Sequence, residues 1–316
     1  MDEQNNIDLL TRVAWLYYYE DLSHQEIAGL LGLSRIKVTR LLKIIRDKKL
    51  VEIKIKNPCW SILETEKKLK LVTSLQSAIV VPSGKDPSVH IARAAARRLQ
   101  ELCSCHERIG IGAGRALSRT VEVFEPLSGS MVREVVSLLG NTMPNLALNP
   151  YALGLMLTNK LKVDFFNIWA PAVASSAETA AVYKKDYIIS KVLEMASTVE
   201  AAILGIGDIR STVMLTRGFI SAREAEEIGS CGAVGEILGR FFDLEGRRIP
   251  TILEDRVIAV QMPMKCPVTA VAYGEEKVAG IAGAIRGNLI QDLITDEITA
   301  RKLIAIFGKT KGSPEC

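Results

Sequence analysis

The chain has 316 residues, of which 48% are hydrophobic and 24% charged, so its composition excludes a disordered protein and allows a large buried core. Six cysteines are too few for a disulfide-stapled secreted scaffold. The acidic start and the lack of an apolar run near the roughly 20 residues of a membrane span predict a cytoplasmic protein that does not enter the membrane. The net charge of +4 is unevenly spread: residues 1–33 carry one basic and six acidic side chains, residues 34–56 nine basic and two acidic ones.

Three helices are predicted in the first part of the chain. Apolar residues at three- and four-residue spacing predict a helix over 7–19. Ser23 followed by Glu26 forms a capping-box pattern that begins a second helix, and Gly32 ends it. Ser34 is the expected N-cap of a third helix. The buried stripe of that helix is predicted at Val38, Leu41, Leu42 and Ile45.

The third helix is predicted to bind DNA. Two helices separated by three or four residues, the second with a basic exposed face, are the helix-turn-helix arrangement. The alternating run over 51–56 predicts a strand that acts as a wing. The alternative, a solvated basic helix of an ordinary bundle, is disfavoured by the charge asymmetry and the matched caps. The predicted DNA contacts are Ser34, Arg35, Lys37, Thr39, Arg40, Lys43 and Lys54.

A domain boundary is expected at Asn57-Pro58, because proline cannot continue a strand ladder. We therefore predict a winged helix-turn-helix domain over 1–57 and a larger domain over 58–316. Residues 58–76 form the predicted linker, with a mildly amphipathic helix that either pairs with a second copy of itself or is simply solvated.

From residue 78 onward, short apolar runs alternate with segments that have helical periodicity. Such alternation predicts an α/β fold with a largely parallel sheet covered on both faces. Ligands of such sheets bind beyond the carboxyl ends of the strands, at the topological switch. The predicted strands are 78–81, 109–112, 135–139, 163–168, 201–206, 257–260 and 269–273, and the predicted helices include 87–102, 187–198, 221–229 and 296–307.

Three glycine-bearing strand ends are candidate ligand contacts. Gly112 and Gly114 leave a strand into a helix-like stretch, so their backbone N–H groups can approach an anion or a hydroxylated ligand. Their G-x-G-x-G spacing does not fit a dinucleotide fingerprint, and we expect no nicotinamide or other cofactor. Residues 140–142 are small and polar, with a plain turn as the alternative. Lys277 opens a helix after a strand, and a solvated surface lysine is the alternative there.

The sequence resembles the SorC family of bacterial sugar-responsive transcription regulators from end to end. The resemblance rests on residues 26–43 in the helix-turn-helix and on later segments in the expected order, such as 109–112, 135–140, 170–172, 204–207, 232–237 and 293–297. It implies a large α/β domain of Rossmann-like type, related to phosphosugar isomerases. It also implies a dimer or tetramer that binds double-stranded operator DNA under the control of a sugar, polyol or sugar phosphate.

The same resemblance implies which residues hold the effector. They are the loop of Gly140, Asn141 and Thr142, together with Arg217, Glu236 and Lys277. Arginine and lysine donate hydrogen bonds to phosphate or hydroxyl groups, and a carboxylate accepts them from sugar hydroxyls.

Three departures from the family pattern bear on the effector. The usual Gly-Gly pairs are replaced by Gly-Asn at 140–141 and by Gly-Glu at 274–275. Glu275 and Glu276 add negative charge, which argues against a doubly phosphorylated ligand and for a neutral polyol or a singly phosphorylated sugar. Leu139 stands where some members carry a Schiff-base lysine, so covalent capture is not expected. Regulators of sorbitol or erythritol catabolism suggest a short polyol, and we expect a repressor.

The sequence also allows other functions. A phosphosugar isomerase or deaminase with an appended DNA-binding domain needs an acid/base pair, yet His90 and His106 lie in no recognisable catalytic motif. Cys103, Cys105 and His106 lack a second pair at ligand spacing, so no metal site is expected. A plain interaction module would not need the basic third helix. We therefore expect a regulator and not an enzyme.

Overall fold

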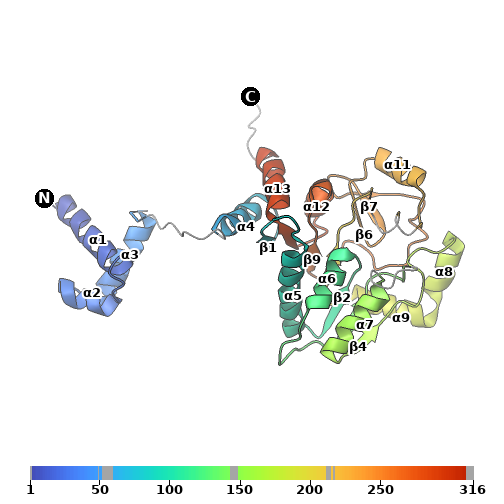
Figure 1. Ribbon diagram of the computed structural model, residues 1–316, viewed down its shortest axis with the longest axis horizontal. Helices are drawn as coiled ribbons and strands as arrows, with labels where there is room; N and C mark the ends of the chain where they lie inside the picture. The colour runs from blue at the N-terminus through green and yellow to red at the C-terminus, as the bar shows by residue number, and fades with distance from the viewer. Residues whose placement is uncertain are drawn as a thin grey trace. The chain divides into compact units, whose positions relative to one another are not determined.

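The computed structural model describes residues 2–48, 50–51, 60–142, 149–210, 215 and 218–310. They belong to two compact units, Met1–Asn57 and Pro58–Cys316 (Figure 1). Of the predicted site residues, Lys54 and Arg217 lie outside the described residues, as does nearly all of the predicted wing over 51–56.

The N-terminal unit contains the three predicted helices, α1 (Asp2–Tyr18), α2 (His24–Leu31) and α3 (Arg35–Asp47). Ser23 and Glu26 form the predicted capping box, and Gly32 ends α2 in the left-handed conformation that favours glycine, with φ of +64°. The helices pack around a shared apolar core in which Val13, Ile27 and Ile45 are fully buried. The helix-turn-helix prediction is confirmed.

The larger unit is built on one seven-stranded sheet in which every neighbouring pair is parallel. The strand order is β1 (Ser77–Val81), β10 (Asp292–Asp296), β9 (Val268–Val271), β5 (Ala201–Gly205), β2 (Arg108–Ile111), β3 (Glu134–Ser137) and β4 (Asp164–Phe166). Side chains alternate between two hydrophobic cores along the strands: Ile203 contributes to one face and Leu204 to the other.

Helices cover both faces of this sheet, which confirms the α/β prediction (Figure 1). One face is covered by α5 (Ser88–Cys105), α6 (Arg115–Val123) and α7 (Pro150–Leu161). The other face is covered by α4 (Trp60–Val72), α9 (Tyr187–Ser197), α11 (Ala222–Ser230), α12 (Val278–Arg286) and α13 (Glu297–Thr310). The described residues also form α8 (Ala177–Lys185), the short 3-10 helix η2 (Glu275–Lys277), and an antiparallel sheet of β6 (Gly235–Ile237), β7 (Arg240–Phe242) and β8 (Arg248–Ile249).

The predicted linker helix corresponds to α4, which packs against α13 and β1. Its Leu69 is fully buried, so one side of this helix belongs to the core of the larger unit.

Two parts of this unit differ from the sequence prediction. The run over 257–260 is not a strand: it makes isolated bridges, Leu139 with Ala259 and Val173 with Val257, and lies over the end of β3. Strand β10 was not among the predicted strands, although it lies between β1 and β9. Within the described residues, no helix has the length and apolar content needed to cross a bilayer.

Candidate functional site

The exposed face of α3 presents the basic residues that the sequence singled out. Ser34 caps the helix by accepting a hydrogen bond from Lys37 N at 3.2 Å, while the apolar stripe faces the core of the unit. The predicted contacts Ser34, Arg35, Lys37, Thr39, Arg40 and Lys43 are all exposed. Four of them are basic: Arg35, Lys37, Arg40 and Lys43. In the described part of the chain, none of these four side chains forms an ion pair. Their charges are therefore available to phosphates or base edges.

Two further features of this face emerge from the structure. Thr39 Oγ1 donates to Arg35 O at 3.1 Å and lies 3.0 Å from His24 Nδ1, so this hydroxyl also connects α3 to α2. Ile36 is 83% exposed between two predicted contacts. An apolar side chain at the start of a recognition helix can contact a thymine methyl group. Ile36 is not among the contacts predicted from the sequence, although its position outside the apolar stripe of the helix can be seen there.

The order in which the chain adds strands to the large sheet reverses between the neighbouring strands β2 and β5. From β2 the chain continues to β3 on one side, whereas the next large-sheet strand after β5 is β9 on the other side. Gly112 N donates to Ile203 O at 2.9 Å, and a Cβ atom at Gly112 would lie 2.8 Å from Leu204 Cβ. Gly114 has φ of +128° and precedes the first residue of α6. Both predicted glycines therefore lie at the switch point, where such sheets bind ligands.

The structure brings Glu236 and Lys277 together at this edge. Glu236 lies on β6, whose backbone pairs with the loop after β5: Gly207 N donates to Glu236 O at 2.8 Å, and Glu236 N to Gly207 O at 3.0 Å. Glu236 is 7% exposed, and its Oε1 accepts a hydrogen bond from Gly239 N. Lys277 is half-buried at the end of η2.

Burial lowers the pKa of Lys277, since the charged ammonium is disfavoured away from water. The carboxylates of Glu276, Asp208 and Glu236 oppose this effect, whereas Arg115 adds to it. The cluster therefore contains two cations and three carboxylates, which suits a ligand with hydroxyl groups and at most a modest charge. Arg115 and Asp208 were not predicted, although each follows a glycine at the end of a strand.

Glu275 is turned toward α13, where its carboxylate pairs with Lys302. Its charge is thus offset by a lysine, and of the two acidic residues predicted near the ligand only Glu276 acts on Lys277.

The loop after β3 is held by backbone contacts. Gly140 N donates to Ile258 O at 2.9 Å, and Asn141 N to Ala170 O at 2.8 Å. A Cβ atom at Gly140 would lie 2.7 Å from Pro171 O, so only glycine fits there. Thr142, the third predicted residue of the loop, is buried.

Neither His90 nor His106 is among the groups that act on the pKa of Lys277. His106 ends α5 at the amino edge of the sheet, with Nδ1 at 3.7 Å from a Glu200 carboxylate oxygen. His90 is exposed on α5. Burial raises the pKa of the nearby Cys103 thiol to about 12. Over the described ranges, no three or more His, Cys, Asp and Glu side chains are grouped so as to hold a metal ion.

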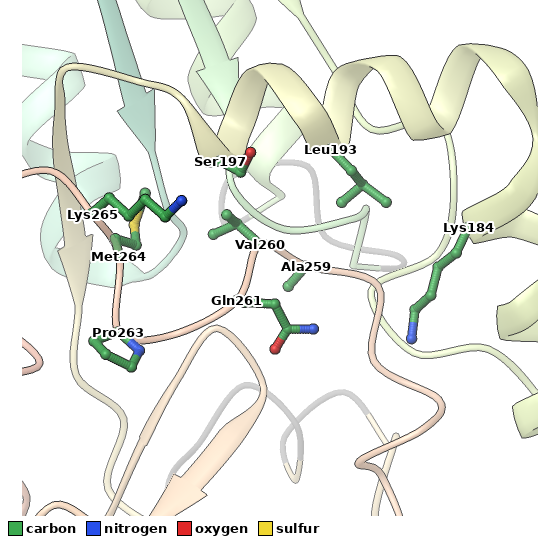
Figure 2. Close-up of a pocket in the computed structure, with 9 residues that line it drawn as sticks. All are labelled: Lys184, Leu193, Ser197, Ala259, Val260, Gln261, Pro263, Met264 and Lys265. Atoms are coloured by element: carbon green, nitrogen blue, oxygen red, sulfur yellow. The ribbon is translucent and has the colours of Figure 1, made fainter.

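A separate pocket of about 270 Å³ lies beside α9 (Figure 2). Ser197 and Lys265, which line it, come shortly before β5 and β9, whereas Ala259 and Val260, which also line it, lie over the end of β3. This pocket contains none of the predicted effector residues.

Comparison with known proteins covers both units. Residues 58–305 match the family described as "Putative sugar-binding domain", and residues 21–51 match that of bacterial regulatory proteins of the crp family. The chain is 31% identical to the transcriptional regulator LsrR of Enterobacter sp. (strain 638), over 95% of this chain and 94% of the relative. It is 32% identical to the erythritol catabolism regulatory protein EryD of Brucella abortus (strain 2308), over 94% and 96%. The full-length sorbitol operon regulator SorC from Klebsiella pneumoniae superposes with a TM-score of 0.74 at 25% identity, over 95% of this chain and 99% of that one.

Proposed function

Because the chain belongs to the SorC family of sugar-binding transcriptional regulators, we propose that it binds operator DNA with an affinity set by a sugar-type effector. The observation that carries this proposal is the exposed, unpaired basic face of α3, joined in one chain to a sugar-binding-type domain. A regulator of this kind acts in the cytoplasm, where the DNA is.

The N-terminal unit reads the operator with α3 in the major groove. Arg35, Lys37, Arg40 and Lys43 bind phosphates or guanine edges, and Ile36 contacts a thymine methyl group. Ser34 and Thr39 add hydroxyl contacts near the start of the helix. Lys54, in the predicted wing, remains a predicted phosphate contact.

The larger unit holds the effector at the carboxyl edge of its sheet. Lys277 donates to the ligand and Glu236 accepts from its hydroxyl groups, while Gly112 and Gly114 let the backbone come close. The loop of residues 140–142 closes one end of the site. Arg217 remains a predicted ligand contact.

The relatives favour a short polyol or its phosphate as effector, since two of them are named as regulators of erythritol catabolism and of the sorbitol operon. We propose a repressor of a polyol catabolic operon that works as a dimer or tetramer, because two-fold operators are read by paired units. The effector must bind the arrangement with low DNA affinity more tightly than the other one, since equal binding would shift nothing.

The test is fluorescence anisotropy of the full chain on its own upstream DNA at two salt concentrations, with a panel of polyols and sugar phosphates. We expect salt-sensitive binding that one compound weakens. Arg40→Ala should reduce DNA affinity and leave ligand binding unchanged. Lys277→Ala should reduce ligand binding and leave DNA affinity unchanged. If no compound changes the DNA affinity, the proposed control of DNA binding by an effector is contradicted. Turnover of a sugar phosphate without DNA binding would favour the alternative, an isomerase or deaminase.

A further inference from the structure

Three polar side chains in the loops after β3 and β4 carry buried hydrogen-bonding atoms without partners. We refer to Asn141, Thr142 and Asn167 as the amide-hydroxyl cluster. Thr142 and Asn167 are 1% and 2% exposed, and Asn141 is half-buried. The unpartnered atoms are Asn141 Oδ1, Thr142 Oγ1, Asn167 Nδ2 and Asn167 Oδ1, which are four of the eight such side-chain atoms in the part of the chain that the structure describes. Because each such atom costs stability, their concentration at a ligand-binding edge points to hydrogen bonds with a bound molecule.

The contacts around Asn141 bring these two loops side by side. Asn141 N donates to Ala170 O, and Ala172 N donates to Asn141 O, both at 2.8 Å. Asn141 Nδ2 donates to the carbonyl oxygen of Ile168, the residue that follows Asn167 in the chain, at 3.1 Å. A rotated amide would place Asn141 Oδ1 against that carbonyl oxygen. The hydrogen-bond network therefore fixes Oδ1, an acceptor, as the atom left over.

This arrangement suits a hydroxyl group and not a phosphate. A phosphate needs several donors, but the backbone N–H groups of Gly140 and Asn141 already donate to Ile258 O and Ala170 O. The donors left in the cluster are Thr142 Oγ1 and Asn167 Nδ2, and they stand beside two unpartnered amide oxygens. Asn141 Oδ1 would repel phosphate oxygens. A hydroxyl group both donates and accepts, so it can satisfy an amide oxygen and an amide nitrogen alike.

We propose that the amide-hydroxyl cluster binds hydroxyl groups of the effector, and that Asn167 determines specificity there. The end of the effector that reaches β3 and β4 therefore carries hydroxyl groups and no phosphate, and a singly phosphorylated effector places its phosphate toward Lys277. This inference rests on the proposed function, since it describes one end of the same effector site.

The first arm of the test uses the full wild-type chain. Isothermal titration calorimetry compares four- to six-carbon polyols, their monophosphates and the bisphosphates phosphorylated at both ends. We expect a polyol or a monophosphate to bind, and the bisphosphate of the same carbon chain to bind at least about tenfold more weakly. This arm needs no variant, so it decides the question even if a substitution in the cluster prevents folding.

The second arm compares Asn167→Leu with the matched control Asn159→Leu, whose site is exposed on α7. Leucine has a similar size but forms no hydrogen bonds. Asn167→Leu should weaken effector binding about tenfold or more, while Asn159→Leu leaves it unchanged. The Tm of ligand-free Asn167→Leu should not fall, because the change removes two unpartnered buried atoms. A purely structural asparagine would instead lower the Tm.

Two outcomes would overturn the inference alone. In the first, a bisphosphate binds as tightly as the corresponding monophosphate. In the second, Asn167→Leu leaves the effector affinity unchanged, whereas Lys277→Ala abolishes effector binding. If no compound binds the wild-type chain or changes its DNA affinity, the proposed effector function fails and this inference fails with it.

Discussion

Gly140→Ala should destabilise the larger unit through a single added methyl group. The new Cβ atom would lie 2.7 Å from Pro171 O and 2.8 Å from Ala170 O, well inside ordinary contact distance. Both obstacles are backbone atoms, which cannot rotate away as the end of a flexible side chain can. The loop after β3 and the segment after β4 must therefore move apart.

The cost follows from the contacts that this movement strains. Overpacking in a well-packed core costs about 1–3 kcal/mol. The two hydrogen bonds that join the segments, from Asn141 N and from Ala172 N, contribute about 0.5–1.5 kcal/mol each. We expect the free energy of unfolding to fall by about 2–6 kcal/mol, and the effector affinity to fall with it because Asn141 and Thr142 are displaced.

The assay is urea unfolding of the full chain, followed by far-UV circular dichroism, with Gly229→Ala as the matched control. Gly229 lies on α11 with nothing within 4 Å of the added Cβ atom, so that change should be neutral or stabilise by up to about 1 kcal/mol. If Gly140→Ala is as stable as the control and binds effector normally, the close packing of this loop is refuted.

Four further predictions concern both units. Arg40→Ala should lower operator affinity and reduce the slope of log affinity against log salt by about 1; an unchanged slope in anisotropy titrations would exclude a phosphate contact. Ser34→Ala should cost about 1 kcal/mol of local stability by removing the N-cap of α3, which faster hydrogen exchange of the α3 amides in the full chain would report. The lowered pKa of Lys277 predicts that affinity for a phosphorylated effector falls as the pH rises through that pKa, below the ordinary 10.5, because the neutral amine no longer attracts the anion. Calorimetry across that range should show no such fall for a neutral polyol. Gly112→Ala should cost about 1–3 kcal/mol in urea unfolding, because its Cβ atom would press on Leu204 and part β2 from β5.

Local signals in the sequence were sufficient for the N-terminal unit. The capping box of Ser23 and Glu26, the helix end at Gly32 and the N-cap Ser34 all act within four residues of the groups that they satisfy. The period of the apolar residues then defines which side of α3 is buried. The exposed basic face follows from the same pattern, because a helix places every residue at a known angle.

For the larger unit, the sequence determined the α/β class and the strand ends at Gly112, Gly140 and Lys277. It did not determine which strand ends are neighbours. The run over 257–260 has the apolar composition of a strand but lies over the end of β3, and β10 reaches its place only through contacts with β1 and β9.

The same limit applies to the effector site. Asn167 falls inside the run predicted as a strand over 163–168, and it gains its proposed role only because β4 ends at Phe166, β3 and β4 pair, and their following loops come together. From the sequence, Glu275 was expected to add negative charge near the ligand. In the structure, Lys302 on α13 forms an ion pair with it. Caps and periodicity depend on neighbours in the chain, so the sequence alone determined the helices, the charged face and the fold class of this protein. Which distant loops meet, and which polar atoms are left for a ligand, depends on long-range packing that only the tertiary structure decided.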